Sequence, residues 1–202
     1  LTKVIQHPSS VQPVYAGCSK LNYAKLRRNF KDANVIFEGC SSLEVVDLSE
    51  SNFENCQGYE RLFDGCKNLR KDGIIGFDNL QFRGSMGSTF QGCINFGDWS
   101  FVLEKDFSEV RSLQSTFQSS SFDIEDITSV SFDNVTNYTL AFSGTPITQH
   151  HVKFSNKVRM LDRTYMNCKN LTKVTMTADS DLSNVYRRSA MFVGCTNLIE
   201  EF

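Results

Sequence analysis

Hydrophobic and polar positions alternate in a short segment, patterned L-x-x-V-x-L, that recurs along the chain. Clear copies are residues 43–48 and 171–176, and Phe96, Trp99 and Phe101 repeat the pattern with larger side chains. The partial period of two and the β-branched residues predict a strand, because successive side chains of a strand point to opposite faces. We expect one short strand per repeat, with the strands stacked into a parallel sheet.

A second pattern, V-x-x-L-x-x-x-F, follows the strand in each repeat. Its clearest copies begin at Val110, Val135 and Val158. A spacing of i, i+3 and i+7 places three apolar side chains on one face of about two helical turns. The sequence therefore predicts a short helix or helical turn after each strand.

An aromatic residue followed by glycine and cysteine, F-x-G-C, marks the period of the repeat. The aromatic positions are 15, 37, 63, 90, 117, 142, 165 and 192, in steps of 22 to 27 residues. A unit of this size cannot bury its apolar side alone, so neighbouring units must stack. The predicted core ladder comprises Phe37, Phe63, Phe90, Phe117, Phe142 and Phe192 with Cys40, Cys66, Cys93, Cys168 and Cys195.

These patterns predict an α/β solenoid of the leucine-rich-repeat type, with about eight repeats in one repeat domain over residues 1–202. Both ends of the sequence read as strands, and neither shows the polar capping unit that usually closes a solenoid. We therefore expect a fragment or module of a longer protein, whose uncapped ends contact flanking domains or subunits.

The combination F-x-G-C-x-x-L-x-x-V-D-L-S followed by V-x-x-L/M-x-x-x-F resembles the BspA-like leucine-rich repeats, especially the branch first described in mycoplasma lipoproteins. The likeness extends over essentially the whole chain. It implies a cell-surface, extracellular or virion protein that serves adhesion, and it supplies no catalytic residues. Departures include Ser120 and Thr145 in place of cysteine.

Composition and charge narrow the possible partners. The formal net charge is −2 at pH 7, which offers no general attraction to nucleic acid, and the pairs Arg27-Arg28 and Arg187-Arg188 are too isolated in sequence to form a phosphate-binding stripe. No apolar run approaches the roughly 18 residues that a membrane span needs. We expect neither a nucleic-acid partner nor a membrane span in this segment.

The cysteines and histidines give no sign of a metal site. Six of the seven cysteines occupy one repeat position and Cys56 fits the apolar pattern, so all are expected as free thiols in the core. His150 and His151 would point in opposite directions on a strand, and His7 reads as a loop residue. No nucleophile motif, phosphate loop or dinucleotide fingerprint is present. We expect no metal, no cofactor and no catalytic residues.

The exposed strand positions are the predicted binding surface, because a solenoid presents a wide and rigid array of side chains. By register they are Asn22, Lys25, Glu44, Asp47, Arg70, Lys71, Asp98, Ser100, Lys173 and Thr175. The favoured hypothesis is a surface module that binds protein or glycan through this face. The alternative is a structural subunit of a larger assembly, such as a virion or cell-envelope complex, and an enzyme ranks third. Sequons at Asn134, Asn137 and Asn170 leave glycosylation open.

Overall fold

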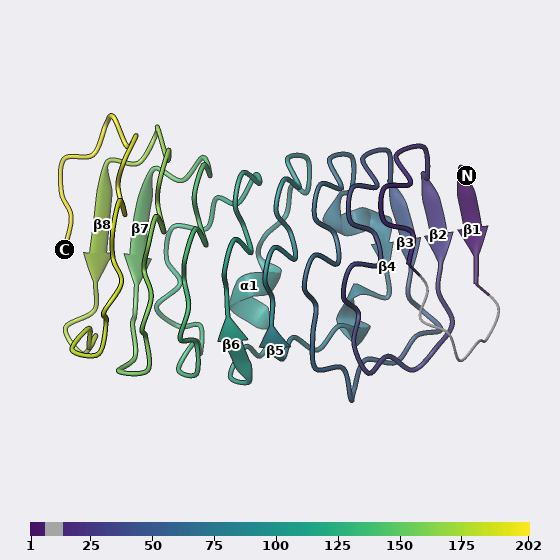
Figure 1. Ribbon diagram of the computed structural model, residues 1–202, viewed down its shortest axis with the longest axis horizontal. Helices are drawn as coiled ribbons and strands as arrows, with labels where there is room; N and C mark the ends of the chain where they lie inside the picture. Colours follow the sequence, from purple (N-terminus) through teal and green to yellow (C-terminus); the bar gives the residue numbers. More distant parts are fainter. Residues whose placement is uncertain (7–13) are drawn as a thin grey trace.

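The computed structural model describes residues 1–6 and 14–202; His7 lies outside the described residues. The chain forms a β-solenoid of about seven turns that stack along one long axis, with the two termini at opposite ends (Figure 1). Its strands are β1 (Lys3–Ile5), β2 (Tyr23–Lys25), β3 (Val45–Asp47), β4 (Ile74–Ile75), β5 (Gly84–Ser85), β6 (Val110–Ser112), β7 (Gln149–Val152) and β8 (Lys173–Met176). Helical structure is confined to α1 (Phe101–Glu104) and the 3₁₀ turns Lys71–Gly73 and Phe77–Asn79.

Parallel strands run along two sides of the stack. On the first side, which we call the strand face, β1 to β4 form one sheet and β7 pairs with β8. On the second side, β5 pairs with β6, and isolated parallel bridges continue this ladder from Ser112 to Asn137, Met160 and Arg187. The predicted parallel stacking of one short strand per turn is therefore confirmed for most turns of the strand face.

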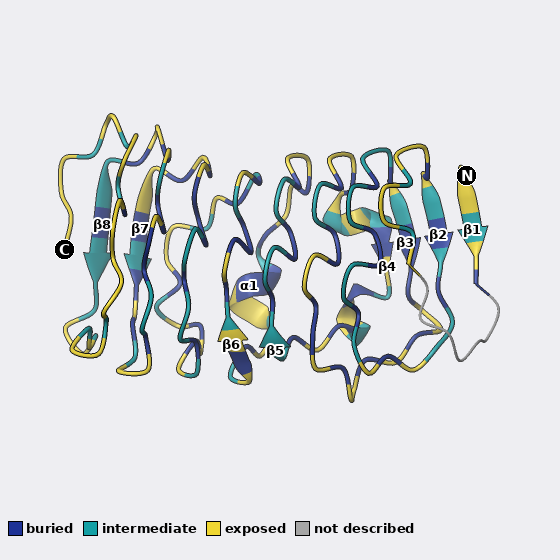
Figure 2. Ribbon diagram, in the orientation of Figure 1, coloured by how far each residue is buried: buried dark blue, intermediate teal, exposed yellow. Residues whose placement is uncertain are grey.

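Aromatic rings stack through the centre of the solenoid in the predicted order. The rings of Phe37 and Phe63 are parallel within 2° at 6.0 Å, and those of Phe90 and Phe117 within 3° at 6.3 Å. The ladder continues through Tyr165, and Phe192, its last member, is only half-buried. Figure 2 shows the buried segments lining the interior of successive turns. The core predicted from the F-x-G-C repeat is thus present.

The predicted helix in each repeat is wrong. In the copy that begins at Val110, the first three residues form strand β6, and Ser115 and Ser119 have φ values of 54° on either side of Phe117. A left-handed residue cannot continue a right-handed helix. Val110, Leu113 and Phe117 are all fully buried, so the spacing reflects inward-facing positions around a corner and not the face of a helix.

The same left-handed corner recurs along the stack. A residue with positive φ stands two positions before and two positions after the ladder aromatic, as with Arg61 and Gly65 around Phe63. The amides of these corners donate to the next turn, for example from Phe63 to the carbonyl of Thr89 at 2.9 Å. The backbone amides of each corner therefore form their hydrogen bonds with the next turn, as those of a strand do with its neighbour, and not with the residue four positions earlier, as in a helix.

The strand face is interrupted at α1. The sequence predicts a strand around Phe96, Trp99 and Phe101, but the chain makes one helical turn instead. Phe101 and Val102 are both buried, whereas Leu103 is 48% exposed. Consecutive residues of a strand point to opposite faces, so two buried neighbours fit a helical turn better than a strand. Figure 2 shows both buried and exposed parts on α1. The crowded rings of Phe96 and Trp99, 4.5 Å apart, fill the core beneath it.

Candidate functional site

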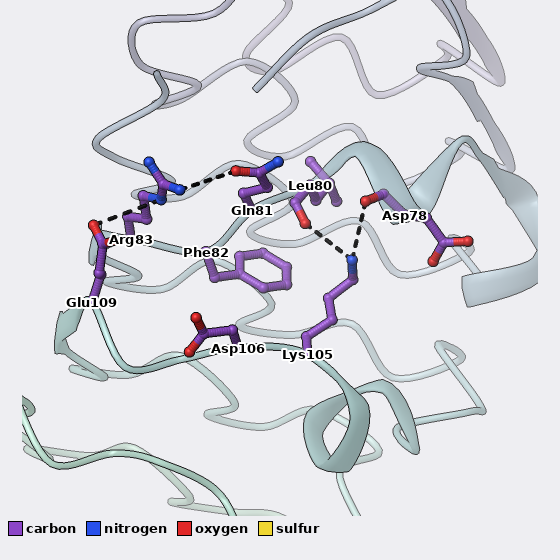
Figure 3. Close-up of a pocket in the computed structure, with 8 residues that line it drawn as sticks. All are labelled: Asp78, Leu80, Gln81, Phe82, Arg83, Lys105, Asp106 and Glu109. Carbon is purple, nitrogen blue, oxygen red and sulfur yellow. Dashed lines mark hydrogen bonds and ion pairs between the residues drawn. The ribbon is translucent and has the colours of Figure 1, made fainter. Parts of the chain in front are cut away.

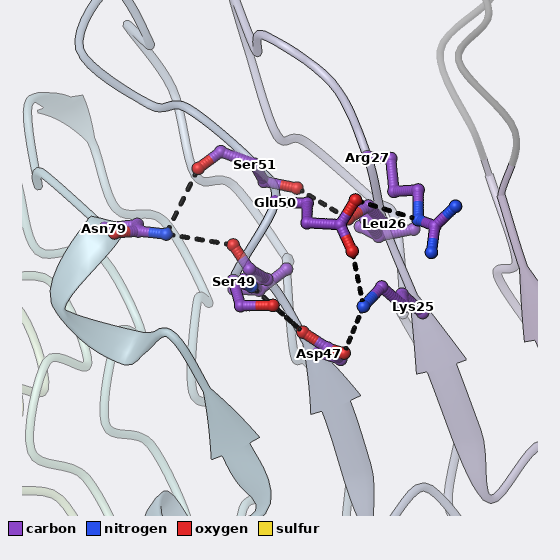
Figure 4. A network of polar contacts seen from close by, with 9 residues as sticks. Lys25, Leu26, Arg27, Asp47, Ser49, Glu50, Ser51 and Asn79 are labelled. Carbon is purple, nitrogen blue, oxygen red and sulfur yellow. Dashed lines mark hydrogen bonds and ion pairs between the residues drawn. The ribbon is translucent and has the colours of Figure 1, made fainter.

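The predicted binding residues of β2 and β3 are held in a network of ion pairs (Figure 4). The Lys25 ammonium lies 2.9 Å from the Asp47 carboxylate and 2.7 Å from that of Glu50, which also pairs with Arg27 at 3.2 Å. The hydrogen bonds that Lys25 donates to Glu50 and Asp47 raise its pKa. This network joins neighbouring turns, and it leaves Lys25 few free donors for a partner.

Asp47 is not on the exposed surface, contrary to the expectation from its register. Its residue is only 7% exposed, and its carboxylate accepts both the amide and the hydroxyl of Ser49, at 3.0 and 2.6 Å. Burial alone would raise the pKa of Asp47, but these hydrogen bonds and the Lys25 charge bring it below its ordinary value. An ionised carboxylate so close to the core needs such partners. We assign Asp47 a structural role.

Three other predicted residues, Arg70, Lys71 and Asp98, also form ion pairs. Lys71 binds Asp98 at 2.8 Å, and Arg70 binds Asp72 at 3.1 Å. The hydrogen bond from Lys71, together with the amide of Ser100, lowers the pKa of Asp98 to about 2. Unlike Asp47, the side chains of Arg70 and Asp98 are largely exposed, at 65% and 54%, whereas Lys71 is half-buried. They remain accessible to a partner.

A groove lies on the strand face beside β4, where the 3₁₀ turns Lys71–Gly73 and Phe77–Asn79 flank the strand. One cavity of about 380 Å³ lies between β4 and the turn that leads to α1, lined by Arg70, Lys71, Asp98, Phe77 and Phe96 among others. A second cavity of about 360 Å³ adjoins it, shares Arg70 and Asp72, and reaches Glu44 on the β3 side. The structure therefore brings together four of the predicted residues, Glu44, Arg70, Lys71 and Asp98, around one concavity that we call the strand-face groove.

The remaining predicted residues lie elsewhere. Asn22 is exposed beside β2, and Ser100 is half-buried at the start of α1. Lys173 and Thr175 lie on β8 at the far end of the strand face, where Lys173 pairs with Glu200 at 2.9 Å. Thr175 contacts a ring nitrogen of His151 at 2.6 Å. These residues do not reach the strand-face groove.

A third cavity of about 340 Å³ lies on the other side of the 3₁₀ turn Phe77–Asn79 and shares Asp78 with the groove (Figure 3). The Lys105 ammonium projects into it and donates to the backbone carbonyls of Asp78 and Leu80, at 3.3 and 3.0 Å. Burial lowers the pKa of Lys105. Arg83 lines the same cavity and lies 3.7 Å from Glu109. No motif or hydrophobic pattern in the sequence singles out Lys105.

None of the seven cysteines forms a disulfide. The thiols of the ladder donate hydrogen bonds to backbone carbonyls instead. The Cys93 thiol donates to the carbonyl of Phe63 at 3.1 Å, and Cys168 donates likewise to Phe142. Burial raises the pKa of Cys40 to about 11 and that of Cys66 well above its ordinary value. A protonated thiol is neither a nucleophile nor a metal ligand. Cys40 and Cys66 are therefore structural, whereas a hydrogen bond from Cys195, which is half-buried at the end of the ladder, lowers the pKa of Cys168 to about 7.

The adjacent histidines diverge, as their place on a strand predicts. His150 is 1% exposed and its Nδ1 lies 2.9 Å from the Tyr165 hydroxyl, whereas His151 faces outward. Within residues 1–6 and 14–202, no group of three or more His, Cys, Asp or Glu side chains is placed to hold a metal ion.

The three sequons differ in how their amide groups are used. The Asn134 amide donates to the carbonyl of Ser108 at 2.6 Å, and that of Asn137 donates to Gln114 at 3.1 Å. Asn170 is exposed in the turn before β8. Asn134 and Asn137 thus join neighbouring turns through the nitrogen that glycosylation would use.

One of three comparisons with known proteins finds a match. Neither a curated protein nor a solved structure shows a significant match to the chain. Among the helices of the described part of the chain, none has the length and apolar character needed to cross a membrane. Residues 31–154, more than half of the chain, match the family described as "Mycoplasma protein of unknown function, DUF285", and the chain therefore belongs to this family.

Proposed function

We propose that the chain is a non-catalytic binding module that recognises a partner protein or glycan through the strand-face groove. One observation carries this proposal: beside β4, at the edge of the four-stranded sheet, the strand face is hollowed, and the concavity there collects Glu44, Arg70, Lys71 and Asp98. Binding sites are usually concave and combine apolar walls with a few polar groups. Phe77 and Phe96 supply the apolar wall here.

The ion pairs at the groove suit reversible recognition. Arg70–Asp72 is an exposed pair and Lys71–Asp98 is partly exposed; such pairs contribute little to stability and are exchanged for a ligand's polar groups at small cost. The groups are already oriented by their partners, which limits the entropy lost on binding. Display at the cell surface, and a relationship to BspA-like repeats, are part of the same proposal and are supported by the resemblance of the repeat motif.

The test is a binding screen followed by variants. The purified chain is applied to glycan and protein arrays, and each hit is measured again with the triple variant Glu44→Gln/Arg70→Gln/Asp98→Asn. The control, Lys20→Gln/Glu54→Gln/Asp123→Asn, removes the same charges from exposed positions outside the groove. We expect at least about a tenfold loss for the groove variant and little change for the control. Equal binding by both variants would refute the groove as the site.

A further inference from the structure

The second side of the solenoid carries a concentration of arginine that the overall charge conceals. Four successive turns contribute the segments 111–115, 136–140, 159–163 and 186–190, joined by the bridges from Ser112 to Asn137, Met160 and Arg187. Their charged residues are Arg111, Arg159, Arg163, Arg187, Arg188 and one acid, Asp162. These segments thus sum to a formal charge of +4 in a chain whose total is −2. We call the five arginines the arginine face.

The arginines of this face fall into two groups. Arg187 pairs with Asp162 at 2.6 Å, and Arg159 donates to the carbonyls of Asn156 and Val158, so both are held in place. Arg111, Arg163 and Arg188 are exposed, and none of them has an ion-pair partner within the described part of the chain. Three guanidinium groups are therefore free to bind an anion, beside two that are fixed.

The only acid of the face is already neutralised. Asp162 is 4% exposed and accepts hydrogen bonds from the amide and hydroxyl of Ser189, at 2.8 and 2.9 Å, in addition to Arg187. These interactions keep its pKa below the ordinary value although burial opposes this. Asp162 therefore does not compete for the free arginines. Glu109 lines a cavity together with Arg111, but it lies 3.7 Å from Arg83, so the face keeps a net positive charge.

We propose that the arginine face binds an anionic polysaccharide carrying sulfate or carboxylate groups. Guanidinium groups bind such planar or tetrahedral oxyanions in a bidentate way, and all five cations of the face are arginine. Adjacent turns are spaced by about 4.8 Å, so Arg111 and the turn of Arg188 are separated by about 14 Å. An extended polysaccharide, which carries a charge on each repeating unit, can contact arginines on several of these turns at once.

The neutral residues of the face also favour a glycan. Gln114, Thr136 and Thr139 provide hydrogen-bonding groups between the arginines. Tyr186 is 69% exposed in the same row, where its ring offers a flat surface for a sugar. Single-stranded nucleic acid would need an aromatic for each of several successive bases, and Tyr186 is the one aromatic exposed in these four segments. The observations therefore favour a glycan over nucleic acid.

The test uses heparin as the probe, measured by surface binding of the full chain at low and high salt. We expect binding that weakens as salt increases and that falls at least about tenfold in Arg111→Gln/Arg163→Gln/Arg188→Gln. The matched control, Lys20→Gln/Lys67→Gln/Lys169→Gln, removes three exposed cations from other positions and should bind within about twofold of the unmodified chain. Unchanged thermal unfolding shows that the variants are folded.

Three outcomes would overturn the proposal. They are no binding of heparin at low salt, equal losses in the arginine and lysine variants, and tighter binding of poly(dT) or polyglutamate than of heparin through the same arginines. The strand-face groove variant described above should retain heparin binding. The failure of either site is thereby distinguishable from the failure of the other.

Discussion

The Cys66 thiol donates a hydrogen bond of 3.1 Å to the carbonyl oxygen of Phe37, which is 29 residues earlier in the chain and one turn away in the stack. The same carbonyl also accepts the amide of Cys40, in its own turn. Equivalent thiol bonds run from Cys40 to Tyr15 and from Cys195 to Tyr165. The cysteine of the F-x-G-C motif thus ties each turn to the one before it.

Replacing Cys66 with alanine should lower the free energy of unfolding by about 1–2 kcal/mol, because the change removes a buried hydrogen bond and leaves a small cavity. Chemical denaturation measures the loss. Cys18→Ala is the control, since this cysteine is half-exposed, and its effect should stay within about 0.5 kcal/mol. Equal effects at the two positions would show that the buried thiol bond contributes nothing.

Phe90→Ala should destabilise the chain by about 3–5 kcal/mol. The ring of Phe90 is fully buried and stacks between Phe63 at 5.8 Å and Phe117 at 6.3 Å. Ile94→Ala, at a position that is 52% exposed, should have a small effect. Melting curves of the two variants provide the comparison, and an unchanged melting temperature for Phe90→Ala would contradict the aromatic ladder.

Stability should fall as the solution is acidified below about pH 6.5, the ordinary pKa of histidine. Burial against Phe142 and Tyr165 lowers the pKa of His150 to about 3, so the unfolded chain binds a proton that the folded chain excludes. The stability conferred by neutral His150 is complete above the unfolded pKa and is lost toward pH 3, at roughly 1.4 kcal/mol per pH unit.

Chemical denaturation at a series of pH values measures this dependence. In the window from about pH 6 to 4.5 burial also makes Asp64 titrate, since it raises the pKa of that carboxyl to about 6 and so works against the histidine effect. The contribution of His150 is therefore measured as the difference between the unmodified chain and a His150 variant, in which Asp64 is the same. His150→Phe keeps an aromatic ring against Phe142 and should flatten the curve there. If the unmodified chain and His150→Phe lose stability equally across this window, His150 is not the cause.

The sequence was sufficient to predict the solenoid and its core, because inward-facing side chains must repeat once per turn whatever the backbone does between them. It could not separate a helix from a left-handed corner. The residues two positions before the ladder aromatics include Val35, Leu140 and Arg163, which have no preference for positive φ. In this geometry their own amides donate to carbonyls of the following turn, as from Val35 to Glu60 at 2.8 Å, and this is a constraint of stacking that a single repeat does not display.

The surface was harder to predict than the core. Its strand register predicts that Asp47 is exposed, yet its carboxylate is held close to the core by an ion pair with Lys25 and a hydrogen bond from Ser49. Arg111 and Arg188 are far apart in sequence and look isolated there, but three turns of stacking place them on one side. Comparing charges at equivalent positions of successive repeats would have revealed this grouping. The strand-face groove, in contrast, is lined by residues of the 3₁₀ turns on either side of β4, which no periodic pattern predicts.

The most direct test of the fold compares glycine and alanine at position 115. Ser115 has a φ of 54°, a conformation that costs an alanine about 1–2 kcal/mol and a glycine almost nothing. In a helix the preference is reversed, since alanine is favoured over glycine by about 1 kcal/mol. Chemical denaturation of Ser115→Gly and Ser115→Ala therefore separates the two folds, because the difference in the free energy of unfolding between the variants has opposite signs in the two cases. The left-handed corner predicts that Ser115→Gly is the more stable variant by about 1 kcal/mol; a more stable Ser115→Ala would contradict the β-solenoid and restore the helix.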